Sequence, residues 1–195
     1  QPVNLVEYSV SHYLLARAHL LLGNPGLALE EIRKALALEE ESGHKAYGTP
    51  LVEGQALLQL GRYEEAMASF REALARADAG ERPHVLHEMG VAALDHGAYP
   101  EAEEHLRALV REEGYPYLAQ AYADLAEALY RQGRYQEAEA AAREAVARGA
   151  VAAGELVLGH VAYDLLHLEE ALEHYRKAAE SAEEGSREWV GAQEM

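Results

Sequence analysis

Two histidines stand three residues apart in the segment HVLHE, where His84 and His87 are followed by Glu88. On a helix, imidazoles at this spacing could present two ligands to a metal ion. The order of residues differs from the His-Glu-x-x-His pattern of zinc hydrolases. The segment also stands at the start of an expected helix, where side chains meet solvent. We therefore expect two exposed histidines and no metal site.

Two pairs of carboxylates raise the question of acid–base chemistry, because glycosidases work with two such groups. Asp124 lies three residues before Glu127, and Glu103 is followed by Glu104. All four fall on the polar faces of expected helices, where solvated charge is the usual arrangement. The chain also lacks a phosphate-binding Gly-x-x-x-x-Gly-Lys loop and a Gly-x-Ser-x-Gly nucleophile elbow. The sequence thus predicts no catalytic residues, no cofactor and no enzyme activity.

The overall composition excludes several classes of partner. The 195 residues are 49% hydrophobic and 26% charged, which is typical of a folded chain. With 17 basic and 34 acidic residues, the formal charge of −17 argues against nucleic acid and anionic membranes as partners. No apolar run approaches the roughly 18 residues needed to span a bilayer. Cysteine is absent, which excludes disulfides and thiolate chemistry. A cytoplasmic protein is the expectation.

One pattern occurs five times along the chain, as in LGRYEEAMASFREALAR from Leu60 and QGRYQEAEAAAREAVAR from Gln132. The anchor of each copy is a glycine, or a leucine in the last, and successive anchors are spaced by 38, 36, 36 and 33 residues. This spacing fits one helical hairpin per copy. The anchors are Gly23, Gly61, Gly97, Gly133 and Leu166. The predicted units are 9–46, 47–82, 83–118, 119–151 and 152–185, with a partial helix over 186–195 that begins at a capping Ser186 and includes Trp189 and Ala192.

Each recurring residue type has a physical role in such a hairpin. Glycine at the anchor adopts the left-handed conformation that ends the first helix and reverses the chain. An alanine five residues later marks a position where two helices cross closely, and a larger side chain would push them apart. These alanines are Ala28, Ala66, Ala102, Ala138 and Ala171. One layer further along lie Ile32, Phe70, Leu106, Ala142 and Tyr175.

These features resemble the tetratricopeptide repeat, with its small residue in the first helix, Gly-x-Tyr turn and alanines in the second. The small first-helix residues are Ala16, Gly54, Gly90, Ala126 and Gly159. Most of the anchor spacings exceed the roughly 34 residues common in this family, and in this respect the chain is similar to the longer repeats of bacterial regulators of the maltose-activator type. The resemblance implies an all-α fold over 1–195, a right-handed superhelical solenoid of antiparallel helix pairs. HEAT and Sel1-like repeats match the residues less well.

The resemblance also implies a concave groove that binds a peptide or helix of a partner protein. Tyrosine and arginine are common binding anchors, which favours Tyr13, Arg17, Tyr130, Arg131 and Tyr163, although Tyr130 and Tyr163 could instead pack between repeats. Family members that bind chaperone tails hold a terminal carboxylate with several cationic and amide donors. The matching positions here provide only Arg17, so an amphipathic helix or internal segment is expected instead. The expected groove residues are Tyr13, Arg17, Leu51, Gln55, His84, His87, Val91, Glu127, Tyr130, Arg131, His160 and Tyr163.

Two functions remain open from the sequence. The first is a non-catalytic scaffold for protein–protein interaction. The second is a sensory or oligomerising module of a larger regulatory protein, such as a transcription regulator or signalling enzyme. Because the last repeat has no complete capping helix, we also expect that a homodimer could form through that terminal repeat.

Overall fold

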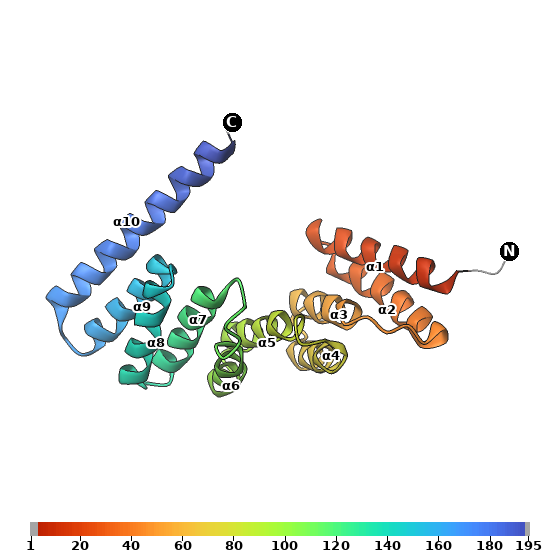
Figure 1. Ribbon diagram of the computed structural model, residues 1–195, viewed down its shortest axis with the longest axis horizontal. Coiled ribbons are helices and arrows are strands. Elements are labelled where there is room, and N and C mark those ends of the chain that lie inside the picture. Colours follow the sequence, from red (N-terminus) through yellow and green to blue (C-terminus); the bar gives the residue numbers. More distant parts are fainter. Residues whose placement is uncertain (1–3, 194–195) are drawn as a thin grey trace. The chain divides into compact units, whose positions relative to one another are not determined.

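The computed structural model describes the backbone of residues 4–193 and the side chains of residues 4–185. Ten helices occupy this part of the chain, and it contains no strand (Figure 1). The predicted all-α fold is therefore confirmed. The helices are α1 (Leu5–Leu21), α2 (Pro25–Ser42), α3 (Gly48–Gln59), α4 (Tyr63–Arg76), α5 (Arg82–His96), α6 (Tyr99–Leu109), α7 (Leu118–Arg131), α8 (Tyr135–Ala147), α9 (Val151–Asp164) and α10 (Leu168–Gln193).

Contacts divide the chain into two compact units, whereas the repeats predict one array. We call residues Gln1–Ala92 unit 1 and residues Ala93–Met195 unit 2, so the boundary falls inside α5. In unit 1, α1 packs on α2, α3 packs on α4, and α3 also contacts α1 and α2 (Figure 1). In unit 2, each helix from α6 to α10 packs on the next, and α7 also contacts α9. Both units are thus stacks of sequential helices, as a repeat protein requires.

The turn inside each repeat has the same hydrogen-bonded geometry. In α3, the N–H of Gly61 donates to the carbonyl of Leu58 at 2.9 Å, and the N–H of Arg62 donates to that of Leu57 at 2.9 Å. This pair of bonds is a Schellman motif, which needs a left-handed residue after the helix. Gly61 supplies it with φ 73°, and Leu166 adopts φ 62° at the matching position of the last repeat. The predicted role of the anchors is confirmed, including the one that is not glycine.

Small residues of one helix lie directly against large residues of the next. A Cβ atom placed on Gly54 in α3 would be 2.4 Å from Cε1 of Phe70 in α4. A Cβ atom on Gly159 in α9 would likewise be 2.6 Å from Cε1 of Tyr175 in α10. Glycine is therefore required where the second helix carries an aromatic ring in this layer. Ala28, Ala66, Ala102 and Ala138 are all fully buried, as their recurring position predicts.

The last helix is longer than the sequence predicts. α10 continues through Gly185 to Gln193, so no separate helix begins at Ser186. A glycine in a helix interior costs only about 1 kcal/mol relative to alanine, and strong helix formers surround Gly185. The side chains of Ser186, Trp189 and Ala192, which the sequence assigns to a new helix, lie outside the described residues.

Candidate functional site

Unit 1 contains a hollow of about 690 Å³. The first helices of three successive repeats, α1, α3 and α5, help to line it. Tyr13 and Arg17 come from α1, Leu51 and Gln55 from α3, and His84 from α5. These are five of the residues expected in the groove from the sequence. The other lining residues are Val6, Ser9, Val10, Leu14, Glu39, His44, Lys45, Ala46, Tyr47, Gly48, Thr49, Val52, Arg76 and Glu81. We call this space the unit-1 hollow.

One side of the unit-1 hollow is formed by Tyr13 and the start of α3. A Cβ atom on Gly48 would be 3.2 Å from the hydroxyl oxygen of Tyr13, so glycine lets the tyrosine ring approach the backbone closely. The guanidinium carbon of Arg17 lies 5.7 Å from the centre of the same ring, in a cation–π arrangement. Tyr13 therefore positions the cation of Arg17 at the hollow.

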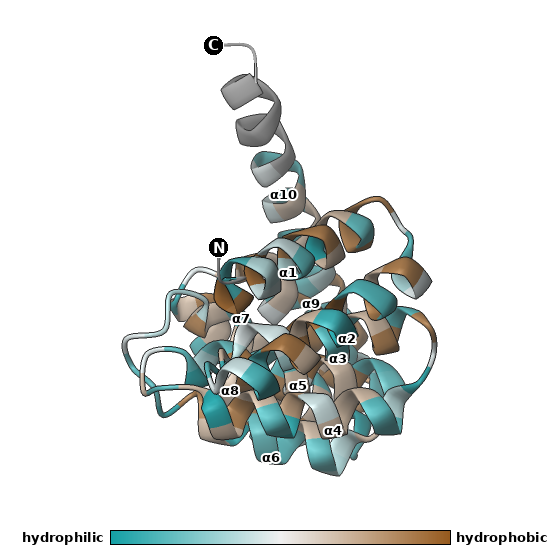
Figure 2. Cartoon of the chain, turned by 90° about the vertical axis from the view of Figure 1, so that its right-hand side faces the viewer, coloured by the Kyte–Doolittle hydropathy of each residue, from teal (hydrophilic) through white to brown (hydrophobic). Residues whose placement is uncertain are grey.

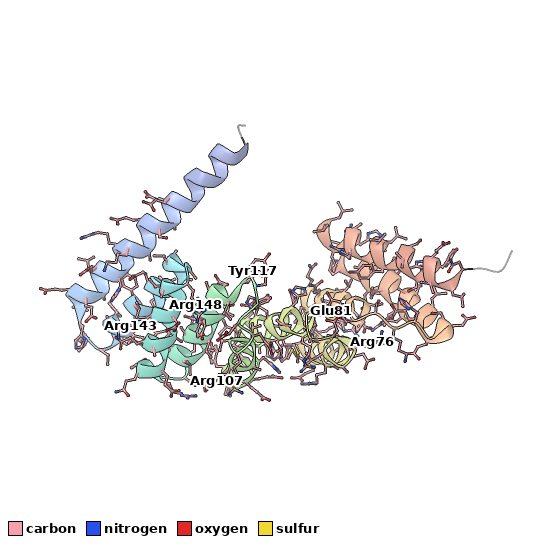
Figure 3. All side chains as sticks on the ribbon, viewed as in Figure 1. Arg76, Glu81, Arg107, Tyr117, Arg143 and Arg148 are labelled. Atoms are coloured by element: carbon pink, nitrogen blue, oxygen red, sulfur yellow. The ribbon has the colours of Figure 1, made fainter. Side chains whose placement is uncertain are left out.

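A buried ion pair forms another part of the lining. Glu39 in α2 is 3% exposed, and its carboxylate lies 2.7 Å from Nη1 of Arg76 in α4. Thr49 donates a 2.5 Å hydrogen bond to the other carboxylate oxygen, and Arg76 also donates to the carbonyl of Ala46 at 3.2 Å. Figure 3 labels Arg76 together with Glu81, which also lines the hollow. These bonds fix the connection between α2 and α3 against α4.

The outer face of α1 adds an apolar strip to the hollow. Val6, Val10 and Leu14 follow one another at four-residue spacing, line the hollow, and keep 38%, 49% and 53% of their surface exposed. Residues four apart share one helix face, so these side chains form a continuous stripe. The brown bands along α1 in Figure 2 mark its hydrophobic residues. We call Val6, Val10 and Leu14 the α1 stripe. The family resemblance places Val10 at a groove position, whereas Val6 and Leu14 were not among the sequence-predicted site residues.

Two other predicted groove residues of unit 1 do not line the hollow. His87 and Val91, both in α5, are half-buried, and neither is among the lining residues. His84 is exposed. Within residues 4–185, no cluster of three or more histidines, cysteines or carboxylates is placed to hold a metal ion.

The predicted residues of unit 2 are mostly engaged with one another. Arg131 donates to Glu127 at 2.6 Å within α7. Tyr130 of α7 and Tyr135 of α8 both donate to the same oxygen of Asp164 in α9, at 3.0 and 3.1 Å. Burial, and then the hydrogen bond to Asp164, raises the pKa of Tyr130 to about 12. Tyr130 therefore links adjacent repeats, which is one of the two roles considered from the sequence.

The remaining predicted residues of unit 2 are His160 and Tyr163, both in α9. The ring of His160 stacks on Tyr130 at 5.4 Å and meets the edge of Tyr175 at 5.6 Å. Its buried Nδ1 has no hydrogen-bond partner among the described residues. Tyr163 is 57% exposed. His160 is thus a packing residue in unit 2, whereas Tyr163 remains accessible.

Three of the four carboxylates considered for acid–base chemistry, Glu103, Asp124 and Glu127, form ordinary polar contacts. Burial raises the pKa of Glu103, but hydrogen bonds from Arg107, Gln132 and Arg134 outweigh burial and leave that pKa below its usual value. A carboxyl group in this state does not serve as a proton donor near neutral pH. Asp124 accepts a 2.8 Å hydrogen bond from Gln120.

Several polar contacts that hold the repeats together join residues separated by about one repeat length. Arg76 lies 37 residues after Glu39, and Asp164 lies 34 residues after Tyr130. Glu39 and Arg76 lie in the second helices of neighbouring repeats, and Tyr130 and Asp164 lie in the first helices of neighbouring repeats. Opposite charges about one repeat length apart are the sequence signal that could have identified the Glu39–Arg76 pair.

Comparison with solved structures gives close likenesses in fold. MamA from Desulfovibrio magneticus RS-1 has a TM-score of 0.77 at 21% identity, over 91% of this chain and 96% of that one. PilF from Pseudomonas aeruginosa has a TM-score of 0.76 at 17% identity, over 92% of this chain and 78% of that one. Nearly identical tetratricopeptide-like repeats of a kinesin light chain of Podospora anserina reach 0.77 at 19% identity, over 96% and 100% of the two chains. At these identities, the likenesses establish the fold alone.

Family comparison identifies the repeats directly. No curated protein matches the chain. Tetratricopeptide-repeat patterns match residues 9–34, 52–79 and 87–153, which together make up more than half of the sequence. These segments fall on the repeats that the anchors define. The chain therefore belongs to the tetratricopeptide-repeat family.

Proposed function

We propose that this chain is a non-catalytic protein-interaction module that binds a segment of a partner protein in the unit-1 hollow. The observation that carries the proposal is the convergence of five residues on one hollow from the first helices of three successive repeats. These residues are Tyr13, Arg17, Leu51, Gln55 and His84. A volume of about 690 Å³ is within the usual range for ligand sites, roughly 300 to 1,000 Å³.

The chemistry of the lining favours an amphipathic segment as the ligand. The α1 stripe provides apolar surface, while Gln55, His84 and the hydroxyl of Tyr13 provide hydrogen-bonding groups. An amphipathic helix binds such a surface through apolar side chains at positions i, i+4 and i+7. The net charge of −17 argues against nucleic acid as the occupant. Within residues 4–193, no helix is both long enough and apolar enough to cross a membrane.

The α1 stripe allows a test that spares the fold. Peptides selected from a random display library on the native chain should bind at least tenfold more weakly to a Val10→Glu, Leu14→Glu variant, because a buried charge replaces apolar contact. Both side chains are about half exposed, so circular dichroism should be unchanged. Leu27→Glu in α2 is the matched control, since Leu27 is 48% exposed and does not line the hollow. Equal loss of binding in the control, or none in the double variant, would overturn the proposal.

A further inference from the structure

The charges around the unit-1 hollow differ from those of the chain as a whole. Arg17, Lys45 and Arg76 line it, against only two carboxylates, Glu39 and Glu81. Glu39 is occupied by Arg76 and Thr49, and Glu81 accepts a 3.0 Å hydrogen bond from the N–H of Asp78. In a chain with 34 acidic and 17 basic residues, this lining has a small excess of positive charge.

Arg17 is the cation at the hollow whose charge is not already balanced. Lys45 lies 2.6 Å from Glu40, and Arg76 lies 2.7 Å from Glu39. Arg17 has no carboxylate within ion-pair distance among the described residues, although it is held over the ring of Tyr13. A guanidinium pairs with a carboxylate through two parallel hydrogen bonds, which adds both strength and orientation. The position of Arg17 thus matches a carboxylate that arrives with the ligand.

We infer that the partner segment carries an internal aspartate or glutamate side chain that pairs with Arg17, next to apolar side chains that pack on the α1 stripe. The inference rests on the proposed binding in the unit-1 hollow and adds the chemistry of the partner. Leu14 lies three residues before Arg17 on the same helix, and Val10 lies seven residues before it, which is about two turns. One bound helix can therefore reach all three.

An internal carboxylate fits the hollow better than a chain terminus. Holding a terminal carboxylate takes several donors from successive repeats, as in the chaperone-binding members of the family. Val52 in α3 stands at one of the corresponding positions, and it is 3% exposed and has no polar side-chain group. A single side-chain carboxylate, in contrast, is satisfied by the one guanidinium of Arg17.

Matched synthetic peptides test the inference. The probe is an acetylated, amidated amphipathic peptide of about fourteen residues, with leucines at positions i, i+4 and i+7 and one glutamate at the edge of the apolar face. A second peptide has glutamine in place of the glutamate, and a third has this glutamine with a free terminal carboxylate. Binding is measured by fluorescence anisotropy to the native chain, to Arg17→Gln, to Arg111→Gln and to the double variant Val10→Glu, Leu14→Glu. Arg111 is exposed and belongs to unit 2, so its variant makes the same change in net charge away from the hollow.

The glutamate peptide should bind the native chain roughly tenfold more tightly than the glutamine peptide, since hydrogen bonds between charged groups carry this difference. Arg17→Gln should remove the difference, Arg111→Gln should keep it, and added salt should reduce it. Equal binding of the glutamate and glutamine peptides to the native chain would overturn the inference. If, in that case, neither peptide bound the Val10→Glu, Leu14→Glu variant, the proposed function would remain intact. Tighter binding of the peptide with the free terminus than of the glutamate peptide would also overturn it. If neither amidated peptide bound the native chain, both proposals would fail.

Discussion

The packing of Gly54 against Phe70 leads to a prediction about a single methyl group. In Gly54→Ala, the new Cβ atom would be 2.4 Å from Cε1, 2.6 Å from Cδ1 and 3.0 Å from Cζ of Phe70. Carbon atoms in contact are normally about 3.5 to 4.0 Å apart, so one helix must move by about 1 Å. The ring cannot move outward, because Phe70 is fully buried.

Two opposing effects set the size of the change in the free energy of unfolding. Overpacking a close contact costs about 1 to 3 kcal/mol, and the short distances here favour the upper part of that range. Alanine in place of glycine in a helix interior gains about 1 kcal/mol. We therefore expect Gly54→Ala to destabilise unit 1 by about 2 kcal/mol.

Chemical denaturation followed by circular dichroism measures this change, and amide hydrogen exchange in α3 and α4 locates it. The matched control is Gly26→Ala in the first turn of α2, where the added Cβ meets nothing within 4 Å and stability should be kept or increased. Phe70→Leu in the Gly54→Ala background should recover part of the loss, which gives a non-zero coupling energy in the double-mutant cycle. Stabilisation by Gly54→Ala, or strict additivity with Phe70→Leu, would refute the packing argument.

Three further predictions concern other contacts. Leu166→Gly should stabilise unit 2 by about 1 kcal/mol, which thermal denaturation measures. A leucine in the left-handed conformation costs about 1 to 2 kcal/mol, but glycine loses more conformational entropy on folding, which offsets part of the gain. Asp164→Asn should lower the pKa of Tyr130 from about 12 towards 10, measured by tyrosinate absorbance. The pKa of Tyr130 is higher in the folded chain than in the unfolded chain. The stability that Tyr130 provides should therefore be complete below pH 10 and lost as the pH rises to about 12. Glu39→Gln should destabilise unit 1 by about 2 kcal/mol in urea, because it leaves the charge of Arg76 poorly compensated.

Each of these predictions has a control. Leu165→Gly, at the preceding right-handed position, should destabilise the chain, and equal effects of the two glycines would count against backbone strain at Leu166. Circular dichroism of Asp164→Asn below pH 10 should match that of the native chain, which would show that the lower pKa of Tyr130 does not come from unfolding. In Glu39→Gln, Arg76 keeps its 2.8 Å ion pair with Glu72. A decrease in the free energy of unfolding much above about 3 kcal/mol would show that Glu72 does not compensate the charge of Arg76.

The repeat pattern predicted most of the fold because one physical requirement recurs at a fixed spacing. A left-handed residue is needed wherever the first helix of a repeat ends, and the sequence marks four of these turns with glycine. Even Leu166 could be placed at the fifth turn, because the neighbouring alanines fixed the register. The pattern did not predict the length of α10, since a glycine such as Gly185 ends some helices and lies within others.

The site was less predictable, because groove positions depend on what each side chain meets in space. Tyr130 and His160 occupy positions expected in the groove, yet Asp164 and Tyr175 engage them inside unit 2. Local sequence cannot show this, since Asp164 lies 34 residues from Tyr130. Val6 and Leu14 of the α1 stripe were missed for a related reason: apolar residues on a helix predict a buried face, and only the structure shows that Leu14 remains half exposed.

Hydrogen–deuterium exchange of the native chain, with and without a display-selected peptide, tests the central claim most directly. The bound peptide should slow exchange in α1, in the connection over residues 43–47 and at the start of α3, which together line the unit-1 hollow. Exchange in α8 and α10 should be unchanged. Protection confined to unit 2, with α1 unaffected, would contradict the assignment of the unit-1 hollow as the binding site.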